Sequence, residues 1–340
     1  GDVMATKLKK LIFRRYCGYR DTEFDFTDDD GDIKPLAVFY GPNGIGKSTC
    51  LRAADLLGSA HRLTTRDTSI LFRKITFHPD YNPTYSGFQE SADPMELTGI
   101  FEEDDGEGNK TERRVVVTTS GVVVNELPKK DPRIGPSVYC QMLNSDSPIE
   151  ASRFSIFQEQ GDMFRQYAEA VYGYPVSFDD GLFGEGVTEL VQGNEVFYSD
   201  FTLTKDNGVK VHFKSMSDGE KKIAKVISSL CDPVWAQCTD VVLIDNIDMH
   251  VYFKRHIAMI ECLVGLFPEK QFLVSTHSGV LVDYLDDQFH YDIEKYRDEE
   301  VKILGLVEAV RPKPMQIDKR KLGKLQELAQ NINIRDEKQQ

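Results

Sequence analysis

A glycine-rich turn that ends in lysine and serine carries the strongest chemical signature in this sequence. It runs Gly41-Pro42-Asn43-Gly44-Ile45-Gly46-Lys47-Ser48-Thr49 and fits the P-loop pattern of a glycine, four residues and Gly-Lys-Ser/Thr. In such a loop backbone N–H groups turn toward phosphate, and the N-terminus of the following helix adds a favourable dipole. Lys47 would reach the β- and γ-phosphates of ATP, and the Ser48 hydroxyl would ligate Mg²⁺. The residues expected around the nucleotide are Asn43, Gly44, Gly46, Lys47, Ser48 and Thr49.

The elements that must position this turn can be predicted from its flanks. The apolar run 36–40 before it predicts a buried strand, and residues 48–57 after it predict a helix because no helix breaker occurs before Gly58. A second apolar run, 241–244, ends in Asp245 and fits the Walker B pattern. A buried strand there would bring Asp245 to the magnesium shell beside Ser48.

A third segment lies between these two motifs. Ser215-Met216-Ser217-Asp218-Gly219-Glu220 is similar to the Leu-Ser-Gly-Gly-Gln/Glu signature of ATP-binding-cassette (ABC) ATPases, with Met216 in place of Leu and Asp218 in place of the first glycine. The resemblance implies that Ser217, Gly219 and Glu220 contact the γ-phosphate held by another protomer. The alternative is an N-capped surface helix. The run Phe272–Ser278 also resembles the family's switch strand, and this implies a γ-phosphate contact for His277.

The start of the chain strengthens this resemblance only loosely. Residues 8–19 form a basic, aromatic segment similar to the first strand of RecF-like and OLD-like ATPases (OLD: overcoming lysogenisation defect). The resemblance covers residues 8–55 and 215–278, with a short insertion between them where SMC proteins carry a long coiled coil. Some compact relatives are ATPase subunits of bacterial phage-defence systems that work with a separate effector. For the family's magnesium-contacting glutamine we expect Gln141, directly after a predicted strand over 137–140, with Gln158 as the alternative.

One position departs from the family pattern. Asn246 follows Asp245, where ABC ATPases usually place the glutamate that orients or deprotonates the attacking water. An amide can hold a water but cannot take its proton at neutral pH. Asp248 and His250 are the candidates for a substitute base. An engineered replacement of a native glutamate would give the same sequence. Two hypotheses follow: an ATPase working as a nucleotide-sandwich dimer in phage defence or DNA repair, or a slowly hydrolysing, ATP-gated scaffold that holds a separate effector.

The expected fold class is α/β. We expect an ABC-ATPase head with a mixed or parallel sheet around the P-loop, an antiparallel β meander, a short helical insertion and no long coiled coil. The expected organisation is a single domain over 1–340. Its parts are an N-terminal lobe (8–150), a helical and β insertion (151–213), a lobe with the signature, Walker B and switch histidine (214–310), and a C-terminal helix and tail (311–340).

Composition limits the remaining functions. The 340 residues carry a net charge of −14, so a uniformly basic nucleic-acid surface is not expected. Local contacts with DNA remain an alternative at two clusters of basic residues. No apolar run is long enough to span a membrane, which predicts a cytoplasmic protein. The six scattered cysteines predict buried thiols rather than zinc or disulfides. The expected partners are a second or further copy of the chain at the ATP sites, a separate effector and DNA, and a nuclease within this chain is not expected. The two basic clusters are Lys7, Lys9, Lys10, Arg14, Arg15 and Arg20, and Lys319-Arg320-Lys321 with Lys324.

Overall fold

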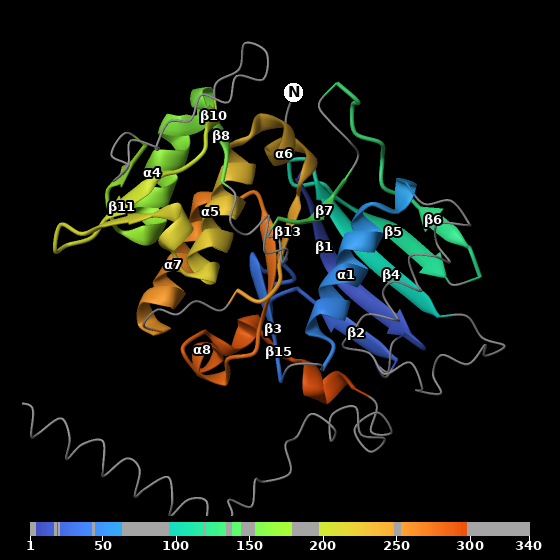
Figure 1. Cartoon of the computed structure of the whole chain (residues 1–340). Coiled ribbons are helices and arrows are strands. Elements are labelled where there is room, and N and C mark those ends of the chain that lie inside the picture. Colours follow the sequence, from blue (N-terminus) through green and yellow to red (C-terminus); the bar gives the residue numbers. More distant parts are fainter. Residues whose placement is uncertain are drawn as a thin grey trace, which may run out of the picture. The chain divides into compact units, whose positions relative to one another are not determined.

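A computed structural model describes most of the chain (Figure 1). The chain divides into two compact units, Gly1–Asp298 and Glu299–Gln340. All described residues lie in the first unit, so the predicted C-terminal helix and tail (311–340) fall outside them. The described residues are 5–16, 19, 21–42, 45–62, 95–118, 120–133, 138–143, 154–178, 197–247 and 253–297.

A five-stranded parallel sheet forms the centre of this unit. Its strand order is β15-β3-β14-β13-β7, and each neighbouring pair is parallel. Every residue of β13 and β14 is buried, as expected for strands covered on both faces. The P-loop strand β3 and the Walker B strand β13 are both neighbours of β14, so their carboxyl ends meet at one edge. The strands are β3 (Leu36–Tyr40), β7 (Cys140–Met142), β13 (Val241–Ile244), β14 (Gln271–Thr276) and β15 (His290–Asp292).

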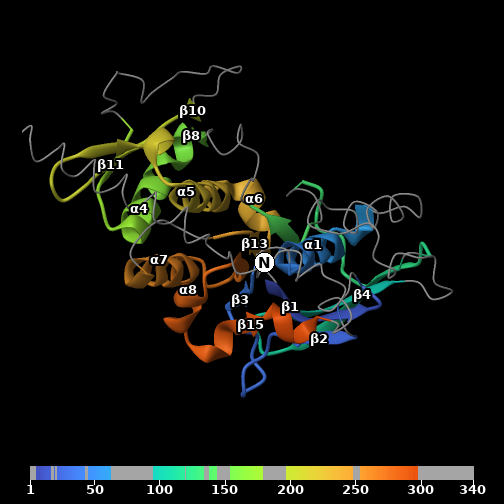
Figure 2. The same ribbon diagram turned by 60° about the horizontal axis from the view of Figure 1, so that its bottom comes forward.

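Helices cover both faces of the parallel sheet. Alternate side chains of the sheet, such as Val242 and Val274, belong to one hydrophobic core with three longer helices of the C-terminal half. On the opposite face α1 contacts β7, β14 and β13. Figure 2 shows this division, with α4, α5 and α7 on one side of the sheet strands and α1 on the other. The helices are α1 (Lys47–Gly58), α4 (Gly161–Tyr172), α5 (Asp218–Cys231), α6 (Pro233–Cys238), α7 (Phe253–Leu266) and α8 (Gly279–Asp283).

An antiparallel sheet forms a second layer. Its order is β2-β1-β4-β5-β6, and β4, β5 and β6 form the predicted meander. Strand β1 buries Leu8, Leu11 and Phe13 on its inner side. The pairing of β1 with β4 shifts register between Leu8 and Lys10, and this is a β-bulge. The strands are β1 (Ala5–Arg14), β2 (Thr22–Asp25), β4 (Glu96–Asp104), β5 (Lys110–Thr118) and β6 (Val123–Asn125).

One buried amide joins the two sheets. Gln271, at the start of β14, is fully buried. Its Oε1 accepts a hydrogen bond from the Leu8 N–H at 2.7 Å, and its Nε2 donates to the Leu8 carbonyl at 2.8 Å. The glutamine therefore satisfies both backbone groups of Leu8, directly before the bulge in β1.

Small strands and an aromatic cluster hold the segment around α4 together. The rings of Phe154, Phe164, Phe201 and Phe213 lie within contact distance of one another and are buried. The pairs are β8 with β10, and β11 with β9 and β12. Their bounds are β8 (Ile156–Phe157), β9 (Val176–Ser177), β10 (Phe197–Tyr198), β11 (Thr202–Thr204) and β12 (Lys210–His212).

The predicted α/β class is confirmed, and several element boundaries change. The strand predicted over 137–140 begins only at Cys140, so Gln141 lies inside β7 instead of after it. The helix after Ser217 begins inside the signature segment, at Asp218. The edge strand β15 was not predicted. No helix in the described part of the chain is both long and apolar enough to cross a membrane. Of the cysteines described, Cys50, Cys140, Cys231 and Cys238 are buried, as expected, and Cys262 is partly exposed.

The amide between the sheets gives a first testable prediction. Replacing Gln271 with Leu leaves a buried N–H and a buried carbonyl of Leu8 without their side-chain partners. We expect the free energy of unfolding to fall by about 2 kcal/mol. Urea denaturation followed by circular dichroism measures it. Gln288→Leu, at an exposed position, is the matched control, and equal stability of the two variants would contradict the bridging role.

Candidate nucleotide site

The P-loop begins at the carboxyl end of β3 and leads directly into α1. Gly46 is the N-cap of α1 and has φ of 106°, a conformation that favours glycine. Lys47 is 4 % exposed, and its Nζ donates to the carbonyls of Gly41 at 2.7 Å and Pro42 at 3.1 Å. No side chain caps the N-terminus of α1 among the described residues. Its first N–H donors and the Lys47 ammonium thus share one short loop, as an anion site requires.

Two further predicted residues of the loop lie outside the described residues, and one lies in the core. Asn43 and Gly44 belong to the first group. Thr49 is 3 % exposed, and its backbone carbonyl accepts a hydrogen bond from the Tyr16 hydroxyl at 3.3 Å. In this structure Thr49 fastens α1 to the segment after β1.

The Walker B aspartate meets the P-loop serine at the carboxyl edge of the parallel sheet. Asp245 follows β13 and is 3 % exposed. Its Oδ2 accepts a hydrogen bond from the Ser48 hydroxyl at 2.7 Å. Its Oδ1 accepts from the Ser275 hydroxyl at 2.5 Å. A buried carboxylate beside a serine hydroxyl is the oxygen donor set that Mg²⁺ takes in P-loop proteins, so these residues fit the ion.

Ser275 was not assigned a role from the sequence. It is fully buried in β14, and its Oγ also accepts the Asn246 N–H at 2.8 Å. The register of β13 with β14 pairs Ile244 with Val274, so the next residues of the two strands are Asp245 and Ser275. Only this register identifies Ser275, because no sequence motif relates a serine at this distance to Asp245.

Asn246 turns the chain away from β13. Its φ of 50° lies in the left-handed region, which asparagine tolerates better than most residues. Its side chain is exposed. Asn246, which stands where the family usually has glutamate, is therefore also suited to the left-handed backbone at this position. Asp248 and His250, the predicted substitute bases, lie outside the described residues.

The signature segment starts α5. Ser217 is the N-cap: its Oγ accepts the Glu220 N–H at 3.3 Å and donates to Glu220 Oε1 at 2.9 Å. Ser217 therefore caps the helix through its side chain, which realises the alternative of an N-capped helix. Gly219 is buried in the first turn. The Tyr172 hydroxyl donates to the Glu220 carbonyl, and burial raises the pKa of Tyr172 well above its ordinary value, so this donor stays protonated. A phosphate contact of Ser217, Gly219 and Glu220 in another protomer stays a prediction.

The predicted switch histidine lies at the same edge of the sheet. His277 directly follows β14 and is exposed, and the next residue, Ser278, caps α8. Its γ-phosphate contact stays a prediction. The structure brings the P-loop, Walker B and switch segments together at the carboxyl ends of β3, β13 and β14.

The sequence is similar to one protein family and to two named proteins. Residues 6–71 match the model of a family described as AAA domain. The chain is 22 % identical over 302 residues to Septu protein PtuA of Bacillus mycoides (strain KBAB4), covering 82 % of this chain and 39 % of that protein. It is 32 % identical over 94 residues to the Retron Vc95 probable ATPase of Vibrio cholerae serotype O1 biovar El Tor, covering 24 % of this chain and 18 % of that protein.

This chain resembles ABC-type P-loop ATPases. It spans less than half the length of each of these two relatives. Among solved structures, an SMC head domain from Thermotoga maritima aligns with a TM-score of 0.46 and 16 % identity, covering 82 % of this chain and 92 % of that one.

A lysine connects the signature helix to the Walker B turn. The Lys222 Nζ donates to the carbonyls of Asp245 and Asn246, both at 3.0 Å. Lys222 lies on α5, five residues after the N-cap Ser217. Lys222 therefore holds the backbone of Asp245 and Asn246 in place. The sequence motifs did not predict this role.

The amide of Gln141, the predicted magnesium-contacting glutamine, points away from this edge. Gln141 pairs with Val242, three residues before Asp245, and its Oε1 accepts the Thr239 hydroxyl at 2.8 Å, before the start of β13. Three strand residues span about 10 Å. Gln158 is exposed in a short 3-10 helix. This arrangement does not support the choice of Gln141, because its amide is bonded toward the opposite end of the strand.

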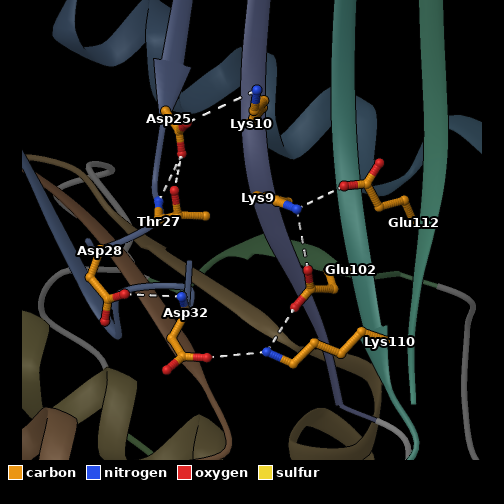
Figure 3. Close-up of polar contacts among 9 residues, drawn as sticks. All are labelled: Lys9, Lys10, Asp25, Thr27, Asp28, Asp32, Glu102, Lys110 and Glu112. Atoms are coloured by element: carbon orange, nitrogen blue, oxygen red, sulfur yellow. Dashed lines mark hydrogen bonds and ion pairs between the residues drawn. The ribbon is translucent and has the colours of Figure 1, made fainter. Parts of the chain in front are cut away.

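Lys9 and Lys10 of the predicted N-terminal basic cluster lie beside carboxylates (Figure 3). Lys9 Nζ lies 2.7 Å from Glu112 and 3.5 Å from Glu102. Lys10 Nζ lies 2.8 Å from Glu23 and 4.0 Å from Asp25. These neighbours raise the pKa of Lys9 and of Lys10, with the hydrogen bonds to Glu112 and Glu23 as the main causes. The lysines stay charged, but their charge is balanced on the sheet surface, which weakens the case for a DNA contact there. The second basic cluster lies outside the described residues.

The lysine between α5 and the Walker B turn gives a second prediction. Lys222→Met removes both donor bonds to the carbonyls, and we expect the free energy of unfolding to fall by about 1 kcal/mol. Amide hydrogen exchange should also become faster in the segment 241–247, because its backbone loses the two hydrogen bonds from Lys222. Lys221→Met, one residue earlier on α5, is the matched control. Unchanged exchange in 241–247 would contradict the role assigned to Lys222.

Proposed function

We propose that this chain binds ATP with Mg²⁺ and acts as an ABC-type ATPase in bacterial phage defence. The observation that carries the proposal is the hydrogen bond between Ser48 and Asp245, which are nearly 200 residues apart in sequence. It lies at the carboxyl edge of the parallel sheet, where the P-loop also lies. A glycine-rich loop alone fits many anions. A buried carboxylate against its serine adds a cation site, and together they fit a magnesium nucleotide.

The roles of the residues follow from this geometry. Lys47 would exchange its bonds to the Gly41 and Pro42 carbonyls for phosphate oxygens. Ser48 and Asp245 would hold Mg²⁺, which neutralises charge on the phosphates when bound. Ser275 would keep Asp245 oriented through the second carboxylate oxygen. His277 would contact the γ-phosphate from the end of β14.

The proposed assembly is a dimer with two nucleotides between the copies. At the N-terminus of α5 the Gly219 N–H would face the phosphate, and the Ser217 hydroxyl and the Glu220 N–H would exchange their bonds to each other for phosphate oxygens. A helix N-terminus attracts phosphate as the P-loop does. We infer that this end of α5 faces the nucleotide on the P-loop of a second copy, so that ATP holds the two chains together.

The defence role is supported by the similarity to Septu protein PtuA and to the retron ATPase. We propose that the chain works in the cytoplasm with a separate effector protein. A role in DNA repair has less support, because Lys9 and Lys10, the centre of one predicted DNA contact, are balanced by carboxylates.

A second function is favoured by Asn246: an ATP-gated scaffold that binds nucleotide and hydrolyses it slowly. The amide supplies no general base, and the left-handed backbone at this residue disfavours a glutamate. In this form ATP binding would hold the dimer and its effector together, and hydrolysis would act only as a slow release.

Steady-state ATP hydrolysis separates the two functions. Three variants are compared with the native chain: Asn246→Asp, which keeps a side chain that tolerates the left-handed turn, Asn246→Glu, and Lys47→Ala as the control for binding. If the scaffold form is correct, native turnover is slow and Asn246→Asp or Asn246→Glu raises it by at least about tenfold.

The mass of each protein with ATP and Mg²⁺ completes this test. An ATP-dependent dimer that Lys47→Ala loses supports the proposed assembly. Brisk native hydrolysis that neither Asn246 variant increases would identify another base and an ordinary ATPase. No ATP-dependent turnover and no ATP-dependent change in mass would overturn both functions.

A further inference from the structure

The segment that follows the edge strand β15 returns to the P-loop. A short 3-10 helix, Ile293–Tyr296, leads to Arg297, which forms a β-bridge with Tyr19. The ring of Tyr296 lies 4.5 Å from that of Phe24, measured between ring centres, in an aromatic cluster between β2 and β3. Figures 1 and 2 both show β15 beside the P-loop strand β3. Residues almost 280 positions apart therefore meet beside the loop that precedes α1.

Tyr19 and Arg297 lie directly against Gly46. The Tyr19 hydroxyl donates to the Gly46 carbonyl at 2.5 Å, and the Arg297 guanidinium stacks over the Tyr19 ring at 4.6 Å. A Cβ added to Gly46 would lie 3.0 Å from Arg297 Nη1 and 3.1 Å from the Tyr19 hydroxyl. The side of Gly46 that lacks a side chain is thus covered by this pair, which fixes the residue before Lys47.

The charge of Arg297 matters because of where it is held. A guanidinium stays protonated at any pH at which proteins are folded. Arg297 is 2 % exposed and Tyr19 is 4 % exposed, so water screens this charge little. The guanidinium lies beside the N-cap of α1, where the helix dipole is already positive. Phosphates bound on the P-loop would therefore experience Arg297 in addition to Lys47.

We propose that Arg297 is a second cation of the triphosphate site, and that with Tyr19 it positions the Gly46 carbonyl and the start of α1. The proposal rests on the nucleotide site proposed above and adds a residue that no P-loop, Walker B or signature motif contains. In this proposal the affinity of the chain for nucleotide phosphates depends on the segment that follows β15. The expected sign of the effect is stronger binding as the number of phosphates increases.

The test compares the binding of ATP, ADP and AMP by titration calorimetry. Arg297→Gln keeps a planar polar end but removes the charge, and we expect ATP affinity to fall by about tenfold, ADP affinity by less and AMP affinity hardly at all. Arg297→Lys should keep most of the ATP affinity, because the charge remains. Tyr19→Phe keeps the stacked ring but loses the bond to Gly46, and should weaken ATP by a few-fold.

The chain offers a matched control for the arginine and tyrosine chemistry. Arg255 on α7 lies over the Tyr174 ring at 4.2 Å, on the opposite face of the parallel sheet from α1. Arg255→Gln should therefore leave the affinities for all three nucleotides unchanged. Thermal denaturation of each variant shows whether it is folded at the temperature of the titration.

The possible outcomes are distinct. Native ATP affinity in Arg297→Gln, or an equal loss for ATP and AMP, would overturn the proposal, since the first excludes any role and the second shows a merely structural one. If Arg297→Gln does not fold, the other two variants decide. The proposal is overturned if Tyr19→Phe binds ATP with native affinity and Arg297→Lys loses the same affinity for ATP as for AMP. It is supported if either variant loses more affinity for nucleotides with more phosphates. Failure of the native chain to bind ATP would instead refute the nucleotide site itself.

Discussion

The contact of the Asp245 carboxylate with two serine hydroxyls is the interaction on which the proposed site depends. A carboxylate that is 3 % exposed is stable only where donors surround it, and Ser48 and Ser275 supply one to each oxygen. The two serines come from α1 and β14, which flank the Walker B turn. The parallel order β3-β14-β13 is what brings these three chain segments to one edge. A different strand order would leave the motifs intact in sequence and separated in space.

The surroundings of this contact limit how far the edge can move. Lys222 fastens the carbonyls of Asp245 and Asn246 to the signature helix on one side. The Gln271 amide ties the other end of β14 to the antiparallel sheet through Leu8. Ser217 begins the helix that carries Lys222, and Lys222 is bonded to the Walker B turn. A ligand at the N-terminus of α5 would therefore act on a helix that is fastened directly to this turn. This connection gives the proposed dimer a physical route from one nucleotide site to the other.

Local patterns predicted the parts of the site that are continuous in sequence. The apolar run before Gly41 and the uninterrupted segment after Lys47 predicted β3 and α1, because a buried strand and a helix are determined largely by nearby residues. The apolar run before Asp245 predicted β13 for the same reason. The Ser48–Asp245 contact followed from the motif pair, whose chemistry requires it.

Contacts set by register and by distant chain segments could not be predicted in this way. Ser275 requires the alignment of β13 with β14, and Arg297 requires the edge strand β15, whose three residues carry no periodic signal. Gln141 was misplaced because the predicted strand ended too early. Lys9 was expected in a basic cluster, since the sequence shows its charge but not that Glu112 comes to lie beside it.

Titration of ATP into the native chain, with and without Mg²⁺, tests the central claim most directly. The Ser48–Asp245 pair predicts that ATP binds in both conditions and that Mg²⁺, which these two residues would hold, increases its affinity by at least about tenfold. Ser48→Ala should remove most of this increase and leave the metal-free affinity close to the native value. Binding that is indifferent to Mg²⁺, or equal Mg²⁺ enhancement in Ser48→Ala, would contradict the account.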